Sequence, residues 1–171
     1  MRERLEDVAA LQALLERSIA EAGPFLRSSF QMPQCSMSAE QVVACFARVV
    51  VVSFATVTKA GSPRVAPIGA LFWRGQFHIP TTLEAARTRH VLARPAVSLA
   101  WHDGIDRAAI VHGRAMVLAE QHPDFAELDQ LHQELTGASV TSWGSGAYLR
   151  VIAEQFFTFD RALGPLVQAP R

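Results

Sequence analysis

The chain has 171 residues, of which 50% are hydrophobic and 19% are charged, as in an ordinary globular domain. Its 16 basic and 16 acidic side chains cancel, so no net charge favours a nucleic acid or an anionic membrane, and two cysteines are too few for a disulfide framework. The charged N-terminus lacks the apolar core of a signal peptide. We therefore expect a cytoplasmic protein that forms a single domain over 1–171, with no membrane and no nucleic-acid partner.

Two helices are predicted ahead of the first strand. Apolar residues at the three-to-four spacing of one buried stripe run from Leu5 to Ala22 and stop at a Gly-Pro pair, after which we expect a loop. Ser38, with a glutamine three residues later, forms a capping box that starts a second helix, which should end at about Arg48. We interpret residues 1–48, approximately, as an N-terminal helical extension.

Three strands should follow as an antiparallel meander. Val49 to Thr58 is rich in β-branched residues and ends at a turn that contains Gly61. The next two strands are joined at Arg74-Gly75, so the meander runs to about Pro80. A short helix is then predicted to open with Thr82.

The second half of the chain continues the pattern. Pro95 starts a strand that turns at Asp103-Gly104 and pairs with Arg107 to Ala119. An apolar stripe over 125–135 predicts a helix closed by Gly137, and 147–159 forms a last strand. Six strands joined mainly by hairpins, with flanking helices, predict a mainly β fold: a closed or nearly closed six-stranded antiparallel barrel.

One segment combines the features of an anion site. Thr81 and Thr82 begin the predicted helix, and Arg87 and Arg89 follow about one turn later. Hydroxyls, free N–H groups and the positive end of the helix dipole would together receive a phosphate, although Thr82 could equally be an ordinary N-cap. Two arginines two residues apart on a helix cannot both face one ligand, so one should be solvated or paired. Glu84 would repel the phosphate if it turned inward.

No side chain can be assigned a catalytic role from the sequence. The six histidines lack metal-ligand spacing and no acidic cluster accompanies them, so we expect no metal site. Each histidine is most simply a surface or strand residue. His78 alternates with Phe77 and Ile79 on a strand that leads to the predicted phosphate site, and we expect it to face a cofactor pocket.

Several segments resemble one known family through their order and spacing. These are GSPRVAPIGALFWRGQFHIPTT, RTRHVLARP, AVSLAWHDG and VHGRAMVL, with a weaker match in AYLRVIAEQFFTF. Together they resemble the FMN-binding split-barrel proteins related to pyridoxamine 5'-phosphate oxidase, which include the reductases that use the deazaflavin F420. The resemblance implies a Greek-key-like split β-barrel and a homodimer that binds FMN, or alternatively F420, at the subunit interface. Trp143 and the FFTF segment offer apolar surface for that interface.

The resemblance also implies cofactor-binding roles for particular residues. A threonine at the position of Thr81 and a basic residue at that of Arg87 bind the FMN phosphate in the resembling oxidases. Arg64 stands where an arginine lies near the phosphate and ribityl chain, although a surface arginine is the plain alternative. Val65, Ala66, Pro67 and Ile68 would lie along the isoalloxazine, unless this strand is simply part of the core.

The sequence departs from the oxidase where the oxidase binds its own substrate. The tail FDRALGPLVQAPR lacks the C-terminal Arg-x-His pair, and Gly69 replaces a lysine. We therefore expect a flavin-dependent oxidoreductase acting on another small organic substrate. An F420-dependent reductase, or a non-catalytic barrel that binds flavin or haem, is the alternative, and haem would need an axial ligand such as a histidine.

Overall fold

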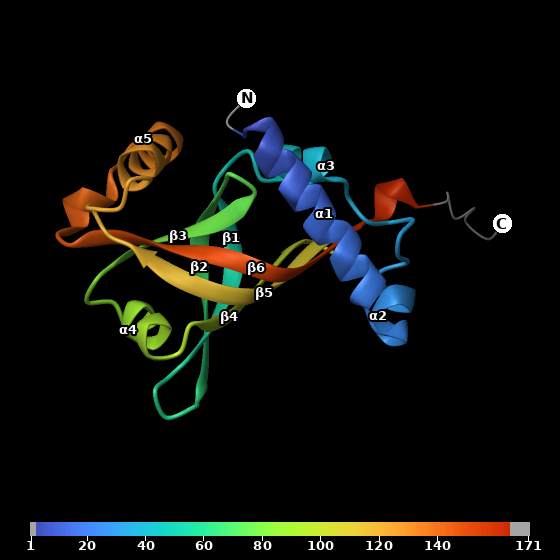
Figure 1. Cartoon of the computed structure of the whole chain (residues 1–171), viewed down its shortest axis with the longest axis horizontal. Coiled ribbons are helices and arrows are strands. Elements are labelled where there is room, and N and C mark those ends of the chain that lie inside the picture. The colour runs from blue at the N-terminus through green and yellow to red at the C-terminus, as the bar shows by residue number, and fades with distance from the viewer. Residues whose placement is uncertain (1–2, 165–171) are drawn as a thin grey trace.

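The computed structural model describes residues 3–164, which form a closed six-stranded barrel with flanking helices (Figure 1). The strands follow the order β1-β2-β3-β6-β5-β4 around the barrel, and every neighbouring pair is antiparallel. The predicted fold class is therefore confirmed. The strands are β1 Val50–Val57, β2 Pro63–Trp73, β3 Gln76–Thr82, β4 Ala96–Asp103, β5 Arg107–Leu118 and β6 Gly146–Asp160.

Five α-helices and two short 3-10 helices surround the described barrel. Before β1 the chain forms α1 (Leu5–Glu21), α2 (Pro24–Ser29) and α3 (Ala39–Cys45). The later elements are α4 (Ala86–Ala93), α5 (Phe125–Thr136) and 3-10 helices at Val140–Trp143 and Arg161–Leu163. Helices α4 and α5 lie toward one end of the barrel, and α1, α2 and α3 toward the other (Figure 1). No helix within residues 3–164 is long and apolar enough to cross a membrane.

The N-terminal helices differ from the sequence prediction in detail. The segment expected to be a loop contains α2, which starts at a proline in the first helical turn. Leu5, assigned to the buried stripe, is 85% exposed, whereas Leu11 and Leu15 of the same stripe are buried. Near the end of α1 the buried Ser18 hydroxyl accepts the Phe156 backbone N–H of β6 at 2.9 Å. Ser38 caps α3 as predicted, and both halves of its capping box form.

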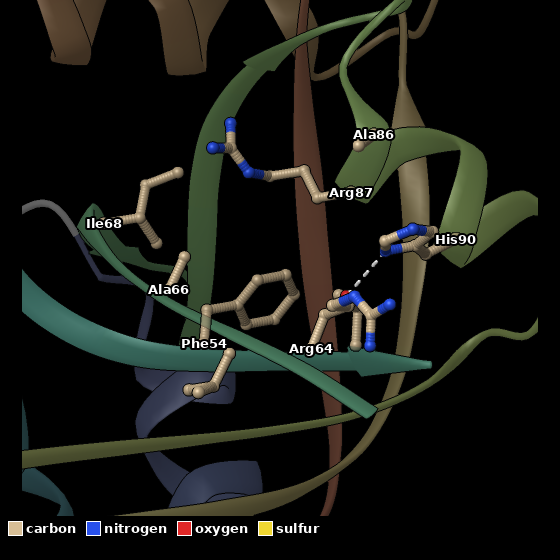
Figure 2. Close-up of a pocket in the computed structure, with 9 residues that line it drawn as sticks. Phe54, Arg64, Ala66, Ile68, Ala86, Arg87 and His90 are labelled. Atoms are coloured by element: carbon tan, nitrogen blue, oxygen red, sulfur yellow. Dashed lines mark hydrogen bonds between the residues drawn. The ribbon is translucent and has the colours of Figure 1, made fainter. Parts of the chain in front are cut away.

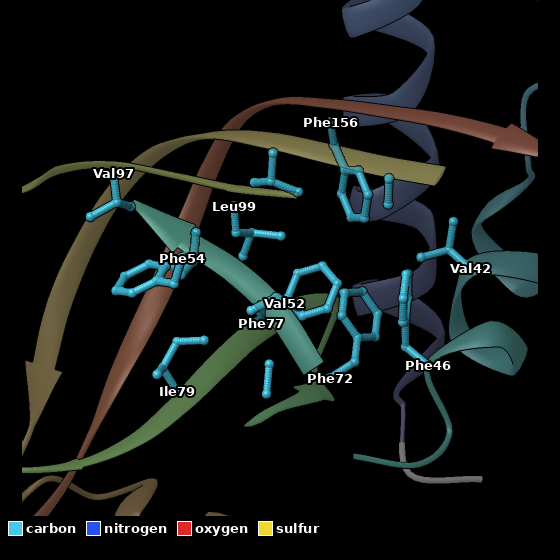
Figure 3. Close-up of a cluster of buried hydrophobic side chains, with 14 of the residues drawn as sticks. Val42, Phe46, Val52, Phe54, Phe72, Phe77, Ile79, Val97, Leu99 and Phe156 are labelled. Atoms are coloured by element: carbon cyan, nitrogen blue, oxygen red, sulfur yellow. The ribbon is translucent and has the colours of Figure 1, made fainter. Parts of the chain in front are cut away.

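Phenylalanine rings fill the centre of the barrel and join it to α3 (Figure 3). Phe46, the C-cap residue of α3, meets Phe72 and Phe77 at ring-centroid distances of 5.7 and 4.9 Å, and Phe77 lies 5.9 Å from Phe156. Phe157 is also buried. The expectation that the FFTF segment offers spare surface is therefore wrong, because Phe156 packs inside the barrel and Phe159 meets Phe30 at the end of α2 with 5.8 Å between the ring centroids.

Gly113 is required at the point where the register between β5 and β6 shifts by one residue. The pairing shifts between His112 and Gly113, so that Glu154 has no opposite residue in β5. A Cβ atom on Gly113 would lie 2.1 Å from the Ile152 carbonyl oxygen. The bulge therefore depends on a residue without a side chain.

Candidate functional site

Strand β2 leaves half of one edge unpaired within the described structure. Residues 63–70 pair with β1, but only Leu71–Trp73 pair with β3. Thr58 N–H donates to the Ser62 carbonyl at 2.9 Å at the start of this strand pair. Because hydrogen-bonded pairs alternate along antiparallel strands, the even-numbered residues of β2 are those whose backbone groups bond to β1. Val65, Pro67 and Gly69 therefore direct their backbone groups toward the open edge. The proline at position 67 is tolerated because its nitrogen, which carries no hydrogen, faces this unpaired edge and no hydrogen bond of the sheet is lost.

A pocket of about 370 Å³ lies between this part of β2, strand β1 and helix α4 (Figure 2). The strands supply a mainly apolar wall, whereas α4 supplies a guanidinium and an imidazole. The principal lining residues are Phe54, Thr56, Ala66, Ile68, Arg87 and His90.

Arg87 is the cation of this pocket. Its half-buried side chain extends from the first turn of α4 toward Ile68 (Figure 2). Among residues 3–164 no carboxylate lies within ion-pair distance of its guanidinium, and its hydrogen bond is the one that Nη1 donates to Thr81 Oγ1 at 3.3 Å. Burial lowers the pKa of Arg87, which is the effect expected of a partly desolvated cation without an anionic partner. An anion bound here would supply that partner.

Two successive hydrogen bonds, which run from the Thr81 hydroxyl to the Thr88 hydroxyl and from there to the Thr82 carbonyl, hold the Thr81 side chain in place. Thr88 Oγ1 donates to the Thr82 carbonyl at 2.7 Å, which uses its one proton. Thr81 Oγ1, 3.3 Å from Thr88 Oγ1, must then be the donor of that pair and the acceptor from Arg87. Thr81 therefore orients Arg87 and anchors the start of α4 to β3.

Two residues near Arg87 have partners outside the pocket. Arg89 is exposed, and its Nη1 donates to the Glu84 carbonyl. The Glu84 carboxylate accepts the Ser145 hydroxyl, a bond that lowers the pKa of Glu84. The structure thus places Arg87 in the pocket and Arg89 outside it, and the Glu84 carboxylate is held by Ser145.

Thr82 does not cap the helix. Strand β3 continues through Thr81 and Thr82, which pair with Ala147 and Gly146 of β6, and α4 starts only at Ala86. The N-cap residue is Ala85, which has no side-chain cap. The sequence prediction was wrong here because the strand is extended by pairing with a segment more than sixty residues away.

The predicted residues of β2 reach the pocket unequally. Ala66 and Ile68 line it with their side chains, and Val65 also contributes. Arg64 lines its outer rim, is exposed, and donates from Nη1 to the Pro63 carbonyl at 2.9 Å. Pro67 lies on the opposite, exposed face of the strand.

His78 lies elsewhere. It is fully buried, its Nδ1 lies 3.1 Å from the Gln76 carbonyl, and its Nε2 accepts from Arg150 Nε at 3.2 Å. Burial and the Arg150 charge lower the pKa of His78 to about 3. The structure therefore does not bring His78 to the pocket, because its side chain points to the Arg150 side of β3.

His90 was missed by the sequence analysis although it lines the pocket. Its Nδ1 lies 2.9 Å from the buried Thr56 Oγ1 (Figure 2). His90 follows Arg87 by three residues, so the two share one face of α4. That spacing could have identified it.

A second pocket, of about 490 Å³, continues from the first past Ile68 and Arg87. It lies between β2, the end of β3, α5 and the 3-10 helix at Val140–Trp143. Its other principal lining residues are Val49, Pro80, Thr82, His132, Ala138 and Trp143. Within residues 3–164 no cluster of three or more His, Cys, Asp or Glu side chains is arranged to hold a metal ion.

The six strands close into a barrel, but β2 and β3 pair over only three residues and leave the rest of that edge of β2 unpaired among residues 3–164. This arrangement defines a split β-barrel protein. A family model described as pyridoxamine 5'-phosphate oxidase matches residues 38–157, so the chain belongs to this family. A search of curated protein sequences gives no match.

Solved structures share the fold at low sequence identity. An F420 reductase is 21% identical with a TM-score of 0.54, over 67% of this chain and 94% of the other. A FAD-binding protein from Mesorhizobium loti is 20% identical with a TM-score of 0.55, over 72% and 93% of the two chains. HutZ, a haem storage protein from Vibrio cholerae, is 14% identical with a TM-score of 0.56, over 80% and 93%. At these identities the likeness establishes the fold alone.

Proposed function

We propose that the chain binds FMN along the open edge of β2 and serves as a flavin-dependent oxidoreductase for a small organic substrate. The observation that carries the proposal is Arg87, a half-buried cation with no carboxylate partner among residues 3–164, beside an apolar strand wall. A phosphate attached to a flat, mainly apolar ring system matches both features.

The donor set of the pocket fits this cofactor. Arg87, oriented by Thr81, would bind the phosphate, and Arg64 at the rim would add a second positive charge. The free backbone N–H groups of Val65 and Gly69 would face the polar edge of the ring, and Phe54 and Ile68 would exclude water from its face. When bound, FMN supplies the two-electron chemistry, so the protein has to provide binding, orientation and a dry site.

The proposal includes a homodimer. The outer face of β1, β2 and β4 is exposed and carries small, uncharged residues next to the open edge of β2. Val51 and Val65 on this face are 66% and 70% exposed. A second copy on this face would bury them and close the cofactor groove. The exposed residues that share the face are Val51, Ser53, Val65, Pro67, Ala96 and Ala100.

Oxidation of pyridoxamine 5'-phosphate itself is not proposed. Gly69 and the C-terminal tail lack the groups with which the oxidase binds this substrate, and residues 165–171 of the tail lie outside the described part of the chain. Gly69 lines the second pocket and brings no charge to it.

Parallel titrations with FMN and riboflavin test the proposal. Because riboflavin lacks the phosphate, we expect FMN to bind at least about tenfold more tightly. Equal affinities would remove the role of Arg87, and absence of binding by both would contradict the proposal. Flavin reduction by a nicotinamide cofactor in the presence of electron acceptors then separates an enzyme from a flavin-binding barrel. A Soret band after addition of haem would instead support the haem-binding alternative.

A second candidate is F420, whose anionic tail extends beyond its phosphate. Basic groups gather at the hairpin end of the pocket, where Arg94 Nε donates to the Lys59 carbonyl at 3.2 Å and Arg64 lies on the rim. These charges would suit the longer anion. Binding of F420 at least tenfold tighter than FMN, about 1.4 kcal/mol, would favour this candidate.

A further inference from the structure

His132 presents an unused nitrogen to the second pocket. The residue lies on α5 and is only 4% exposed, and its ring packs edge-on to Trp143 with 5.8 Å between the ring centroids. Both side chains line the second pocket. The Nδ1 atom lies 3.1 Å from the Tyr148 hydroxyl, whereas Nε2 has no hydrogen-bond partner within residues 3–164. The Nε2 atom is not fully enclosed, so it is an unpartnered acceptor that a donor group of a ligand in the pocket can reach.

The neighbours of His132 fix where its proton lies. Asp129, three residues earlier on α5, accepts from Tyr148 Oη at 2.9 Å, from Ser139 Oγ at 2.6 Å and from the Val140 N–H at 3.0 Å. An ionised carboxylate can only accept, so the single Tyr148 proton points to Asp129. The Tyr148 oxygen is then the acceptor for Nδ1–H of His132, and Nε2 keeps its lone pair.

The charge state of His132 agrees with this assignment. Burial lowers the pKa of His132, and Asp129 opposes the shift to a smaller extent. A neutral ring with its proton on Nδ1 offers one acceptor, at Nε2, to the pocket. The Tyr148 pKa is raised by burial and by its bond to Asp129, so the phenol keeps the proton that this arrangement needs.

We propose that the second pocket binds a small apolar ligand that carries an O–H or N–H group, and that His132 selects this ligand by accepting its hydrogen bond through Nε2. The walls formed by Val49, Pro80, Ala138 and Trp143 suit an apolar body. Because the pocket continues past Arg87 into the first pocket, the ligand would lie beside a cofactor bound there. Its role as the substrate rests on the proposed function, whereas its binding does not.

The test compares 2-naphthol with 2-methoxynaphthalene, which has a similar shape but no donor. We expect calorimetric titration of the cofactor-free protein to show about tenfold tighter binding of 2-naphthol. His132→Phe, which keeps a flat ring, should lose this preference, while Gln133→Ala on the exposed side of α5 should keep it. Circular dichroism checks that both variants are folded.

Nitrogen NMR of the histidine rings gives a second readout that does not depend on a variant. It should show the His132 proton on Nδ1, and addition of 2-naphthol should shift Nε2. Equal affinities for the two probes, no binding of either, a preference retained by His132→Phe, or a proton on Nε2 would each overturn the proposal. Since no flavin is present, these results are independent of whether FMN binds at Arg87.

Discussion

Arg87 Nη1 donates to Thr81 Oγ1 across 3.3 Å, and this contact joins the first turn of α4 to the end of β3. It aims a half-buried guanidinium into the groove beside β2. The contact is the structural basis of the proposed cofactor site, because an oriented cation loses less side-chain entropy when it binds an anion.

Thr81→Val should weaken FMN binding without unfolding the protein. Valine keeps the shape of threonine but removes the acceptor that orients Arg87, so we expect a loss of about five- to tenfold in affinity. Thr81→Ser retains the hydroxyl and should bind nearly as the parent does. Fluorescence titration with FMN measures both. Equal losses in the two variants would mean that the hydroxyl has no role.

His78→Gln should alter how stability depends on pH. A buried histidine with a pKa of about 3 stays neutral in the folded state, while its unfolded form takes up a proton below pH 6.5. Acid therefore favours unfolding between pH 6.5 and about 3. Proton uptake by this one histidine in the unfolded state should lower the free energy of unfolding by about 2 kcal/mol between pH 6.5 and 5.

Urea unfolding at both pH values measures this effect. The parent protein should lose that much more stability than His78→Gln, whose side chain can still accept from Arg150. Parallel pH profiles for the two proteins would show that His78 titrates normally when the protein is folded.

Gly113→Ala should destabilise the barrel. Because the new Cβ atom would lie 2.1 Å from the Ile152 carbonyl oxygen, the β5–β6 bulge would have to open, at a cost on the order of 1–3 kcal/mol. Gly23→Ala serves as the control, since no atom outside the adjacent residues lies within 4 Å of a Cβ at that position. Thermal unfolding compares them, and an unchanged midpoint for Gly113→Ala would contradict the bulge geometry.

Val51→Glu should weaken the proposed homodimer. The residue lies on the exposed outer face of β1, and two buried carboxylates at a symmetric interface would be costly. Light scattering should give a dimer for the parent and for Leu5→Glu, whose site on α1 lies away from this face, and a monomer for Val51→Glu. A monomeric parent protein at micromolar concentration would remove the support for an interfacial site.

The sequence predicts the barrel well because its strands are separated by clear turns. Arg74-Gly75 and Gly137 adopt positive φ where a turn and a helix end were expected. The errors concern long-range effects. Thr82 belongs to β3 because Gly146 pairs with it, and the FFTF segment is buried because it packs in the barrel core and against the N-terminal helices. Neither partner can be identified from local sequence.

The site was predictable where local spacing decides the geometry. Arg87 and Arg89 were expected to have different surroundings, and the structure places only Arg87 in the groove. The second pocket was not predictable, because Asp129, His132 and Tyr148 are brought together only when α5 packs on β6. The open backbone edge of β2 likewise depends on where its pairing with β3 ends.

The dissociation constants for FMN of the parent protein, Arg87→Ala and Arg89→Ala test the proposed cofactor site directly. A charge-assisted hydrogen bond contributes about 1.5–3 kcal/mol, so loss of Arg87 should weaken binding about 10- to 150-fold. Arg89 is exposed and directed to the Glu84 carbonyl, so its loss should change affinity less than about fivefold. If both folded variants bind FMN as tightly as the parent does, α4 is a structural helix and Arg87 does not anchor the cofactor.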